Sequence, residues 1–306
     1  MEKDMKYDTV IESQEGIPAD ARGSNMKKKP GYRVLPFTMN RRMVAASASV
    51  GREQNNIQAI IEVDITQPQR LIREHRQRTG EKLSLTAYVT TCLARAVAEF
   101  PNLNSFRKGR NLIVLDDVTI SALVEREIAG ELVPEHLGIQ AAQTKTYRQI
   151  HNEIRAAQEH GEDGLGGLSG MTWVRFIPGI LLRTFIRLAS RNIRMMERYG
   201  TVGVTAVGMF GGKNQALWLV PLVGGATVGV AVGGIVERPF ASHGQLETRE
   251  HLCLTVTFNH DIVDGAPAAR FLRRFSELLT DGELLRDETD TAAEESENEY
   301  RVSWTR

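Results

Sequence analysis

Residues 258–275 read FNHDIVDGAPAARFLRRF, and this stretch indicates both the fold and the chemistry of the protein. An apolar run typical of a buried strand ends at His260, and a helical pattern begins directly after Asp264 and Gly265. A histidine at the end of such a strand would be partly buried and held in place. Because a neutral imidazole can accept a proton from a thiol or a hydroxyl near neutral pH, His260 is a candidate general base.

The loop between this strand and helix also has a purely structural explanation. Gly265 allows a positive φ or a close approach of another group, and Asp264 could fix the loop or cap the helix. For an isolated HxxxDG pattern, an exposed histidine in a turn followed by a capping aspartate is the better explanation, since the pattern is short. The catalytic interpretation of His260 therefore depends on the rest of the chain.

The length and composition of the chain limit the classes of protein to which it can belong. The chain has 306 residues, enough for one large domain or two ordinary ones, and its 38 basic residues balance its 38 acidic residues, which leaves no positive field for nucleic acid. Cys92 and Cys253 lie far apart in apolar runs and are expected to be free thiols in a reducing compartment. Since no apolar leader or transmembrane run is present, we expect a soluble, cytoplasmic protein.

The ends of the chain differ from its middle. Residues 1–31 are polar, and we expect a flexible N-terminal segment there. Residues 286–306 begin with an acidic run that is nearly free of apolar side chains, and we expect this tail to be disordered. Residues 32–285 are then the folded domain.

The folded domain carries a mixed pattern. Apolar runs predict strands at residues 58–64, 111–125 (a pair), 201–207, 217–223, 227–236 and 251–258, and helical spacing predicts helices at residues 68–78, 84–100, 144–160 and 266–279. His151 and His160 are expected on the polar side of their helix. Because strands and helices do not alternate strictly, the pattern favours a sheet with helices stacked on one face over a doubly wound parallel sheet.

The opening stretch resembles the end of the catalytic core of the dihydrolipoyl acyltransferases of 2-oxoacid dehydrogenase complexes. That family carries DHRxxDGA followed by a helix, and this chain reads NHDIVDGAPAARFLRRFSELL. Upstream segments resemble the family in the same order: FTMNRRMVA (37–45), FPNLNS (100–105), TVGVTAVGMFG (201–211) and VGVAVGGI (228–235). The resemblance implies a chloramphenicol-acetyltransferase-like α/β sandwich with a mixed sheet. As a departure from the family, we expect a stand-alone catalytic domain without lipoyl or peripheral-subunit-binding domains, since the 31 N-terminal residues are too few to build a lipoyl domain.

The resemblance also implies roles for individual residues. His260 matches the family's catalytic histidine, which would deprotonate the thiol of coenzyme A or dihydrolipoamide before it attacks a thioester. Thr205 matches the serine whose hydroxyl donates to the oxyanion, although threonine is also an ordinary strand residue. Asp264 is the third candidate catalytic residue beside His260 and Thr205. It matches an aspartate that is expected to pair with Arg41 and hold the loop. Arg42 is an alternative to Arg41 in that pair.

The residues next to the histidine depart from the family pattern. Gly265 and Asn259 are expected to support the loop, but Asn259 and Asp261 stand where the family usually has an aspartate and an arginine. An acidic neighbour could raise the pKa of His260 by stabilising imidazolium, or it could signal an altered site.

The resemblance implies an assembly as well. Family members form trimers with the active site between subunits, so one chain would supply His260 and a neighbour Thr205. Coenzyme A would be a substrate, and any lipoyl group would arrive on a separate, lipoylated carrier chain. Trimers can join into larger hollow cores. No metal is expected, because the remaining candidate histidines do not cluster with cysteines or carboxylates at ligand spacing: His75, His136, His151 and His160.

Residues 171–199 are unusual for the family, whose segment here is shorter and more polar. Apolar residues follow helical spacing and arginines form a stripe on the other face: Leu181, Leu182, Phe185, Ile186, Leu188, Ala189, Ile193 and Met196 against Arg183, Arg187, Arg191, Arg194 and Arg198. Packing within the domain or against a neighbouring subunit is favoured. Contact with a membrane surface is the second interpretation, and binding of the phosphates of coenzyme A is the third.

The sequence therefore predicts an acyltransferase that moves an acyl group between a lipoyl-type thioester carrier and coenzyme A. Direct attack is expected, since no nucleophile motif such as GxSxG is present. Two alternatives stay open. The first is a catalytically reduced trimer that serves as a scaffold or accessory core of a multienzyme assembly. The second is acetyl transfer to a small hydroxylated molecule by the same histidine chemistry.

Overall fold

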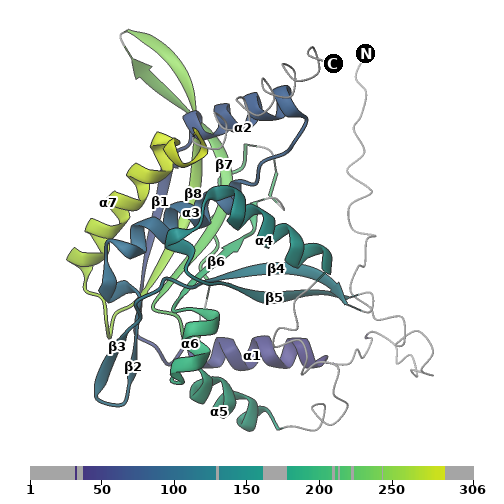
Figure 1. Cartoon of the computed structure of the whole chain (residues 1–306), viewed down its shortest axis with the longest axis vertical. Coiled ribbons are helices and arrows are strands. Elements are labelled where there is room, and N and C mark those ends of the chain that lie inside the picture. Colours follow the sequence, from purple (N-terminus) through teal and green to yellow (C-terminus); the bar gives the residue numbers. More distant parts are fainter. Residues whose placement is uncertain are drawn as a thin grey trace, which may run out of the picture.

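The computed structural model describes residues 32, 37–128, 131–160, 178–208, 211–212, 214–221, 224–242 and 244–286. The predicted flexible segment 1–31, the start of the atypical segment at residues 171–177 and the acidic tail beyond residue 286 lie outside the described residues. Figure 1 shows the described elements as coloured ribbons.

The described residues form these elements. The helices are α1 (Met39–Gly51), α2 (Thr66–Thr79), α3 (Leu85–Ala98), α4 (Tyr147–His160), α5 (Gly179–Ala189), α6 (Ile193–Tyr199) and α7 (Gly265–Asp281), with short 3₁₀ turns at Pro101–Leu103 and Ala142–Thr144. The strands are β1 (Asn56–Asp64), β2 (Ser105–Lys108), β3 (Asn111–Val114), β4 (Ile120–Ile128), β5 (Glu131–Ile139), β6 (Val202–Ala206), β7 (Val228–Ser242) and β8 (Gln245–Asn259).

The main sheet is mixed. Its six strands lie in the order β1-β8-β7-β6-β4-β5, in which β6 runs parallel to both β4 and β7 and the other pairs are antiparallel. Helices α2, α3, α4 and α7 pack against one another and against strands of this sheet on one side (Figure 1). This arrangement confirms the predicted class of a mixed sheet with helices stacked on one face.

The predicted strand pair at residues 111–125 is wrong in its pairing. Strand β3 pairs with β2 in a separate hairpin, whereas β4 enters the main sheet beside β5 and β6. The buried side chain of Asn104 donates to the carbonyl oxygens of Leu115 and Asp117 at 2.8 and 2.9 Å. These hydrogen bonds hold the chain between the two strands against the preceding turn and separate them.

The predicted strand at 217–223 is also wrong, since the described residues 217–221 form no strand. The carbonyl oxygen of Leu217 accepts a hydrogen bond of 3.0 Å from the backbone of Gly234, where the pairing of β7 with β8 is irregular between Val232 and Ile235. A Cβ atom on Gly233 would collide with the Leu217 backbone. The glycines therefore let this apolar segment lie against β7 instead of adding a strand.

An aromatic contact fixes the strand that leads to His260. Phe258 of β8 and Phe271 of α7 are both buried, and their rings meet edge to face with centroids 5.8 Å apart. The hydroxyl of Tyr88 on α3 donates to the carbonyl oxygen of Leu278 on α7 at 2.9 Å. Truncating one such buried phenylalanine costs about 3–5 kcal/mol. The loop between β8 and α7 is thus held firmly at both ends.

The two faces of the sheet differ in chemistry. Val204, Val230 and Val256 belong to the buried core on the helix side. The residues adjacent to these valines, Thr205, Ala231 and Thr255, are in register with one another. Because successive strand residues point to opposite faces, this row lies on the face away from the helices.

Candidate active site

The backbone around His260 is fixed on both sides of the residue. The N–H of Asn259 donates to the carbonyl oxygen of Thr227 at 2.9 Å, and the N–H of His260 donates to the carbonyl oxygen of Asn55 at 2.6 Å. The carbonyl oxygen of Asn259 then accepts from Ile262 and Val263, both at 3.0 Å. Because these hydrogen bonds engage the backbone groups at the end of β8, they hold the backbone of His260 in a tight turn.

The imidazole of His260 lies at the surface, with 45% of the side chain exposed. Its Nδ1 atom is 3.6 Å from Oδ1 of Asp264, whose side chain is 85% exposed. This separation is too long for a hydrogen bond, and an ion pair in such water-exposed surroundings contributes little to stability. The Asp264 side chain makes no capping hydrogen bond to α7, although the residue holds the N-cap position. Asp264 therefore faces the histidine.

Asp261 is held by partners far away in the sequence. Its Oδ1 atom accepts a hydrogen bond of 2.9 Å from Nδ2 of Asn55, and its Oδ2 atom is 3.8 Å from Nη1 of Arg107. Its backbone N–H donates to Oδ1 of Asn259 at 3.0 Å. The acidic residue after the histidine is thus engaged by its own contacts. Sequence reasoning missed Asn55 and Arg107, since nothing in their local pattern marks them.

Two supporting roles predicted from the sequence are not found within one chain. Arg41 is exposed on α1, and the part of the chain that the structure describes contains no ion pair between Arg41 and Asp264. Gly265 has no positive φ, and a Cβ atom placed on it would meet no heavy atom within 4 Å. Neither of the reasons given for a glycine at this position therefore applies inside a single chain.

Thr205 and His260 lie far apart in one chain. Thr205 is half-buried on β6, in register with Ala231 of β7 and Thr255 of β8. His260 follows Thr255 by five residues, so the two side chains are offset by roughly 16 Å along the strands and by roughly 10 Å across two strand spacings. One substrate carbonyl cannot reach both groups of the same chain.

Two more hydroxyls share the face of Thr205. Thr255 and Thr257 are buried, and within the described residues their Oγ1 atoms have no hydrogen-bond partner. A buried polar atom without a partner costs about 1–3 kcal/mol, so such atoms deserve an explanation. Both lie on β8, on the route from Thr205 toward His260, and sequence reasoning did not single them out.

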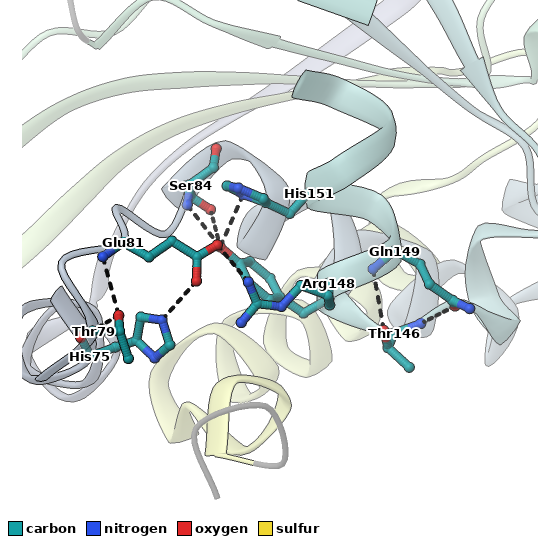
Figure 2. A network of polar contacts seen from close by, with 9 residues as sticks. His75, Thr79, Glu81, Ser84, Thr146, Arg148, Gln149 and His151 are labelled. Atoms are coloured by element: carbon teal, nitrogen blue, oxygen red, sulfur yellow. Dashed lines mark hydrogen bonds and ion pairs between the residues drawn. The ribbon is translucent and has the colours of Figure 1, made fainter. Parts of the chain in front are cut away.

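Two other histidines, His75 and His151, belong to a separate network of polar contacts (Figure 2). His75 is buried, with Nε2 3.0 Å from Oε2 of Glu81, and Arg148 donates to Oε1 of the same carboxylate at 2.5 Å. The hydrogen bond from Arg148 is the main reason that the pKa of Glu81 lies below its usual range, and the contact with His75 acts in the same direction. This network ties α2 to α4.

His151 corrects a sequence prediction. It was expected on the polar side of its helix, but it is buried, with Nδ1 3.4 Å from the hydroxyl of Tyr147 (Figure 2). Burial lowers the pKa of His151. The described residues contain no group of three or more side chains suited to hold a metal ion.

Comparisons with known proteins identify the family to which the chain is similar. The family model of the 2-oxoacid dehydrogenases acyltransferase (catalytic domain) matches residues 29–176 and 189–286. The dihydrolipoyllysine-residue succinyltransferase component of the 2-oxoglutarate dehydrogenase complex of Staphylococcus saprophyticus is 22% identical over 269 residues, which cover 85% of this chain and 55% of that protein. The lipoamide acyltransferase component of the branched-chain alpha-keto acid dehydrogenase complex of Bacillus subtilis is 25% identical, with 81% and 52% covered. The chain thus spans about half the length of these curated relatives.

Solved structures share the fold. A probable dihydrolipoamide acetyltransferase from Listeria monocytogenes aligns with a TM-score of 0.60 at 22% identity, over 83% of this chain and 98% of that chain. The cubic core of a pyruvate dehydrogenase multienzyme complex aligns with a TM-score of 0.61 at 18% identity, over 83% and 93%. The predicted core fold is confirmed by these similarities. No helix among the described residues is long and apolar enough to cross a membrane.

Proposed function

This chain belongs to the family of 2-oxoacid dehydrogenase acyltransferase catalytic domains, and from this premise we propose that it transfers an acyl group between a thioester carrier and coenzyme A. The observation that carries the proposal is the state of His260. Its backbone is fixed at the end of β8, while nearly half of its side chain is open to a substrate. A general base for a thiol needs this combination of fixed position and access.

The reaction needs one base and no covalent intermediate with the enzyme. Because Nδ1 of His260 faces Asp264, Nε2 is left to accept the proton of the attacking thiol. The thiolate attacks the thioester carbonyl, the tetrahedral oxyanion collapses, and the departing thiolate takes the proton back from His260. A free thiol has a pKa of about 8.5, so a base beside it increases the thiolate fraction at neutral pH.

A second copy of the chain would complete the site. Since His260 and Thr205 of one chain cannot share a carbonyl, we expect Thr205 of a neighbouring copy to donate to the oxyanion. Loss of one such donor typically slows the reaction roughly 10²–10³-fold. A homotrimer repeats the same pair of residues at each interface, and larger assemblies can be built from trimers. The similarity to a cubic core supports this arrangement.

The substrates follow from the same chemistry. Coenzyme A would enter as a substrate, and the acyl group would arrive on a lipoyl group carried by another chain. The names of the relatives support this class of reaction, since one is a succinyltransferase component and another a lipoamide acyltransferase component.

One observation favours a catalytically reduced scaffold as a second candidate. Asp264 is largely exposed and is not paired with Arg41 in this chain, so the loop lacks the clamp that the family pattern implies. Such a chain would keep the assembly without supporting transfer.

Turnover of dihydrolipoamide with acetyl-coenzyme A, followed by chromatographic separation of the released coenzyme A from acetyl-coenzyme A, tests the proposal together with calorimetric binding of coenzyme A. His260→Ala is expected to lose nearly all turnover while keeping its assembly size. His251→Ala, which removes a half-buried histidine of β8, the strand that leads to His260, is the matched control. If the wild type neither binds coenzyme A nor exceeds the His260→Ala rate, the scaffold replaces the transferase.

A further inference from the structure

All of helix α5 except its last residue lies in a part of the chain that the family model does not match. The matched segments end at residue 176 and resume at residue 189, whereas α5 spans Gly179–Ala189. It packs against α1, and the two helices lie at the end of the molecule opposite α2 (Figure 1). The function shared by the family therefore does not explain why this helix is present.

One side of α5 is uncovered in the structure. Leu182 is buried, whereas Leu181, Phe185 and Leu188 are 55%, 43% and 64% exposed. Because residues at i, i+4 and i+7 share one face of a helix, the three exposed side chains form a continuous apolar stripe. Further exposed apolar side chains on α5 and around α1 are Ile180, Val44 and Phe37. Exposed apolar surface of this extent marks a contact site.

The segments that contain α1, α5 and the following helix α6 are strongly cationic. Residues 37–53 and 178–199 hold eight arginines and two glutamates, although the whole chain has equal numbers of basic and acidic residues. One of the glutamates, Glu53, accepts hydrogen bonds from Arg187. That contact and the nearby Arg183 and Arg191 keep the pKa of Glu53 below its usual range, so it stays ionised and offsets a single arginine. The surface keeps a large positive excess.

These properties together fit an anionic lipid bilayer. A short helix with an apolar stripe and a cationic flank lies in the plane of a membrane, with the stripe among the acyl chains and the arginines at the phosphates. Arginine side chains can extend from a partly buried stem to the headgroups and bind phosphate with two N–H groups. A second copy that docked through the same surface would bring like charges together, which disfavours it.

We propose that the surface formed by α1, α5 and α6 binds anionic membranes, with Leu181, Phe185 and Leu188 of α5 inserted and the arginines of residues 183–198 on α5 and α6 at the headgroups. This attachment does not depend on acyl transfer. It would hold an enzyme or a scaffold at a bilayer, close to any substrate carried there.

The full chain should co-sediment with vesicles made of equal parts phosphatidylglycerol and phosphatidylcholine, and not with phosphatidylcholine alone. Adding salt should weaken binding. The variants Leu181→Ser with Leu188→Ser, and Arg183→Gln with Arg194→Gln, should each reduce vesicle partition about tenfold or more. The matched controls are Leu246→Ser, at an exposed leucine of the β7–β8 hairpin, and Arg270→Gln with Arg273→Gln, at exposed positions of α7, and neither should change partition.

Three results would overturn the proposal. One is the absence of sedimentation with anionic vesicles. Another is equal binding to both vesicle types with no effect of the arginine variant. The third is a wild type that ignores vesicles while the leucine variant loses its assembled state in sedimentation velocity, because a second copy then covers the stripe. Since both leucines are exposed, the variants are expected to fold, and unfolding curves check this.

Discussion

The side chain of Asn55 donates a hydrogen bond of 2.9 Å to the carboxylate of Asp261, a residue 206 positions later in the chain. The carbonyl oxygen of the same asparagine accepts a hydrogen bond of 2.6 Å from the backbone of His260. One residue directly before β1 thus contacts two successive positions of the proposed catalytic loop. Within one chain, Asn55 takes the holding role that the sequence assigned to Arg41.

We therefore predict a positioning role for Asn55. Asn55→Ala removes the bond to Asp261 but leaves the backbone bond to His260. The turnover number of acyl transfer should fall about tenfold with little change in KM, because a misplaced base affects the transition state more than binding. The free energy of unfolding should fall by at most about 1 kcal/mol. Steady-state kinetics and urea unfolding measure the two effects.

Asn102→Ala, at an exposed asparagine before the β2–β3 hairpin, is the control and should change neither quantity. A loss of stability in Asn55→Ala without any change in turnover would show that the contact is only structural.

The distance between Thr205 and His260 makes subunit mixing informative. His260→Ala and Thr205→Ala should each be nearly inactive alone. When the two are unfolded together and reassembled, about a quarter of the sites in a random trimer would combine an intact His260 with an intact Thr205 of the neighbour. The activity of the mixture should rise to that level, whereas simple addition without reassembly should not raise it. If reassembled mixtures stay inactive, the site is not shared between chains.

The network around Glu81 predicts how stability depends on pH. Because the pKa of this carboxyl is lowered in the folded state, mainly by Arg148, its stabilising effect is complete above the pKa of an unfolded glutamate, about 4.3. The effect is lost as the pH falls through the folded value. The difference in unfolding free energy between the wild type and Glu81→Gln should therefore be largest near neutral pH and shrink below about pH 4.

Urea unfolding at a series of pH values measures this difference. Glu74→Gln, which breaks only an exposed pair with Arg70 on α2, should show a small effect throughout. A difference for Glu81→Gln that stays constant into acid would rule out the carboxylate as its source.

The hydroxyl of Thr255, which has no hydrogen-bond partner among the described residues, gives a stability prediction of opposite sign. Thr255→Val should leave the unfolding free energy unchanged or raise it by up to about 1 kcal/mol, because no hydrogen bond is lost. Thr91→Val is the matched control, since the buried Thr91 hydroxyl donates to the carbonyl oxygen of Ala87 at 2.8 Å and its loss should cost about 1 kcal/mol. Equal destabilisation by both substitutions would mean that the Thr255 hydroxyl gains a hydrogen-bond partner in the assembled protein. Repeating the unfolding at a dilution that dissociates the assembly would then show whether that partner lies on another copy of the chain.

The sequence predicted the elements whose signals are local. The apolar run before His260, the turn at residues 260–264 and the helical spacing after Gly265 lie within about twenty residues, and they predicted the β8–loop–α7 unit correctly. The helices α2, α3 and α4 were predicted for the same reason. Local periodicity also showed that α5 has an apolar side.

These local signals did not predict which segments pack or pair with one another. The apolar run at 217–223 looked like a strand. Because the glycines of β7 have no side chains, the backbone of this run can instead lie directly against β7. His151 looked solvent-facing by its position in the helix, but packing around Tyr147 buried it. In both cases the deciding group belongs to the folded surroundings, which a window of neighbouring residues does not contain.

The sequence by itself thus determined the fold family and placed a histidine at the end of a buried strand, because strand and helix periodicity and the HxxxDG loop are written in consecutive residues. Only the tertiary structure decided that Asn55 and Arg107 hold Asp261, that Arg41 does not reach Asp264 in one chain, and that Thr205 lies too far from His260 to act with it there. These are long-range relationships. They depend on strand register and on which surfaces pack together, and both are fixed by burial across the whole domain.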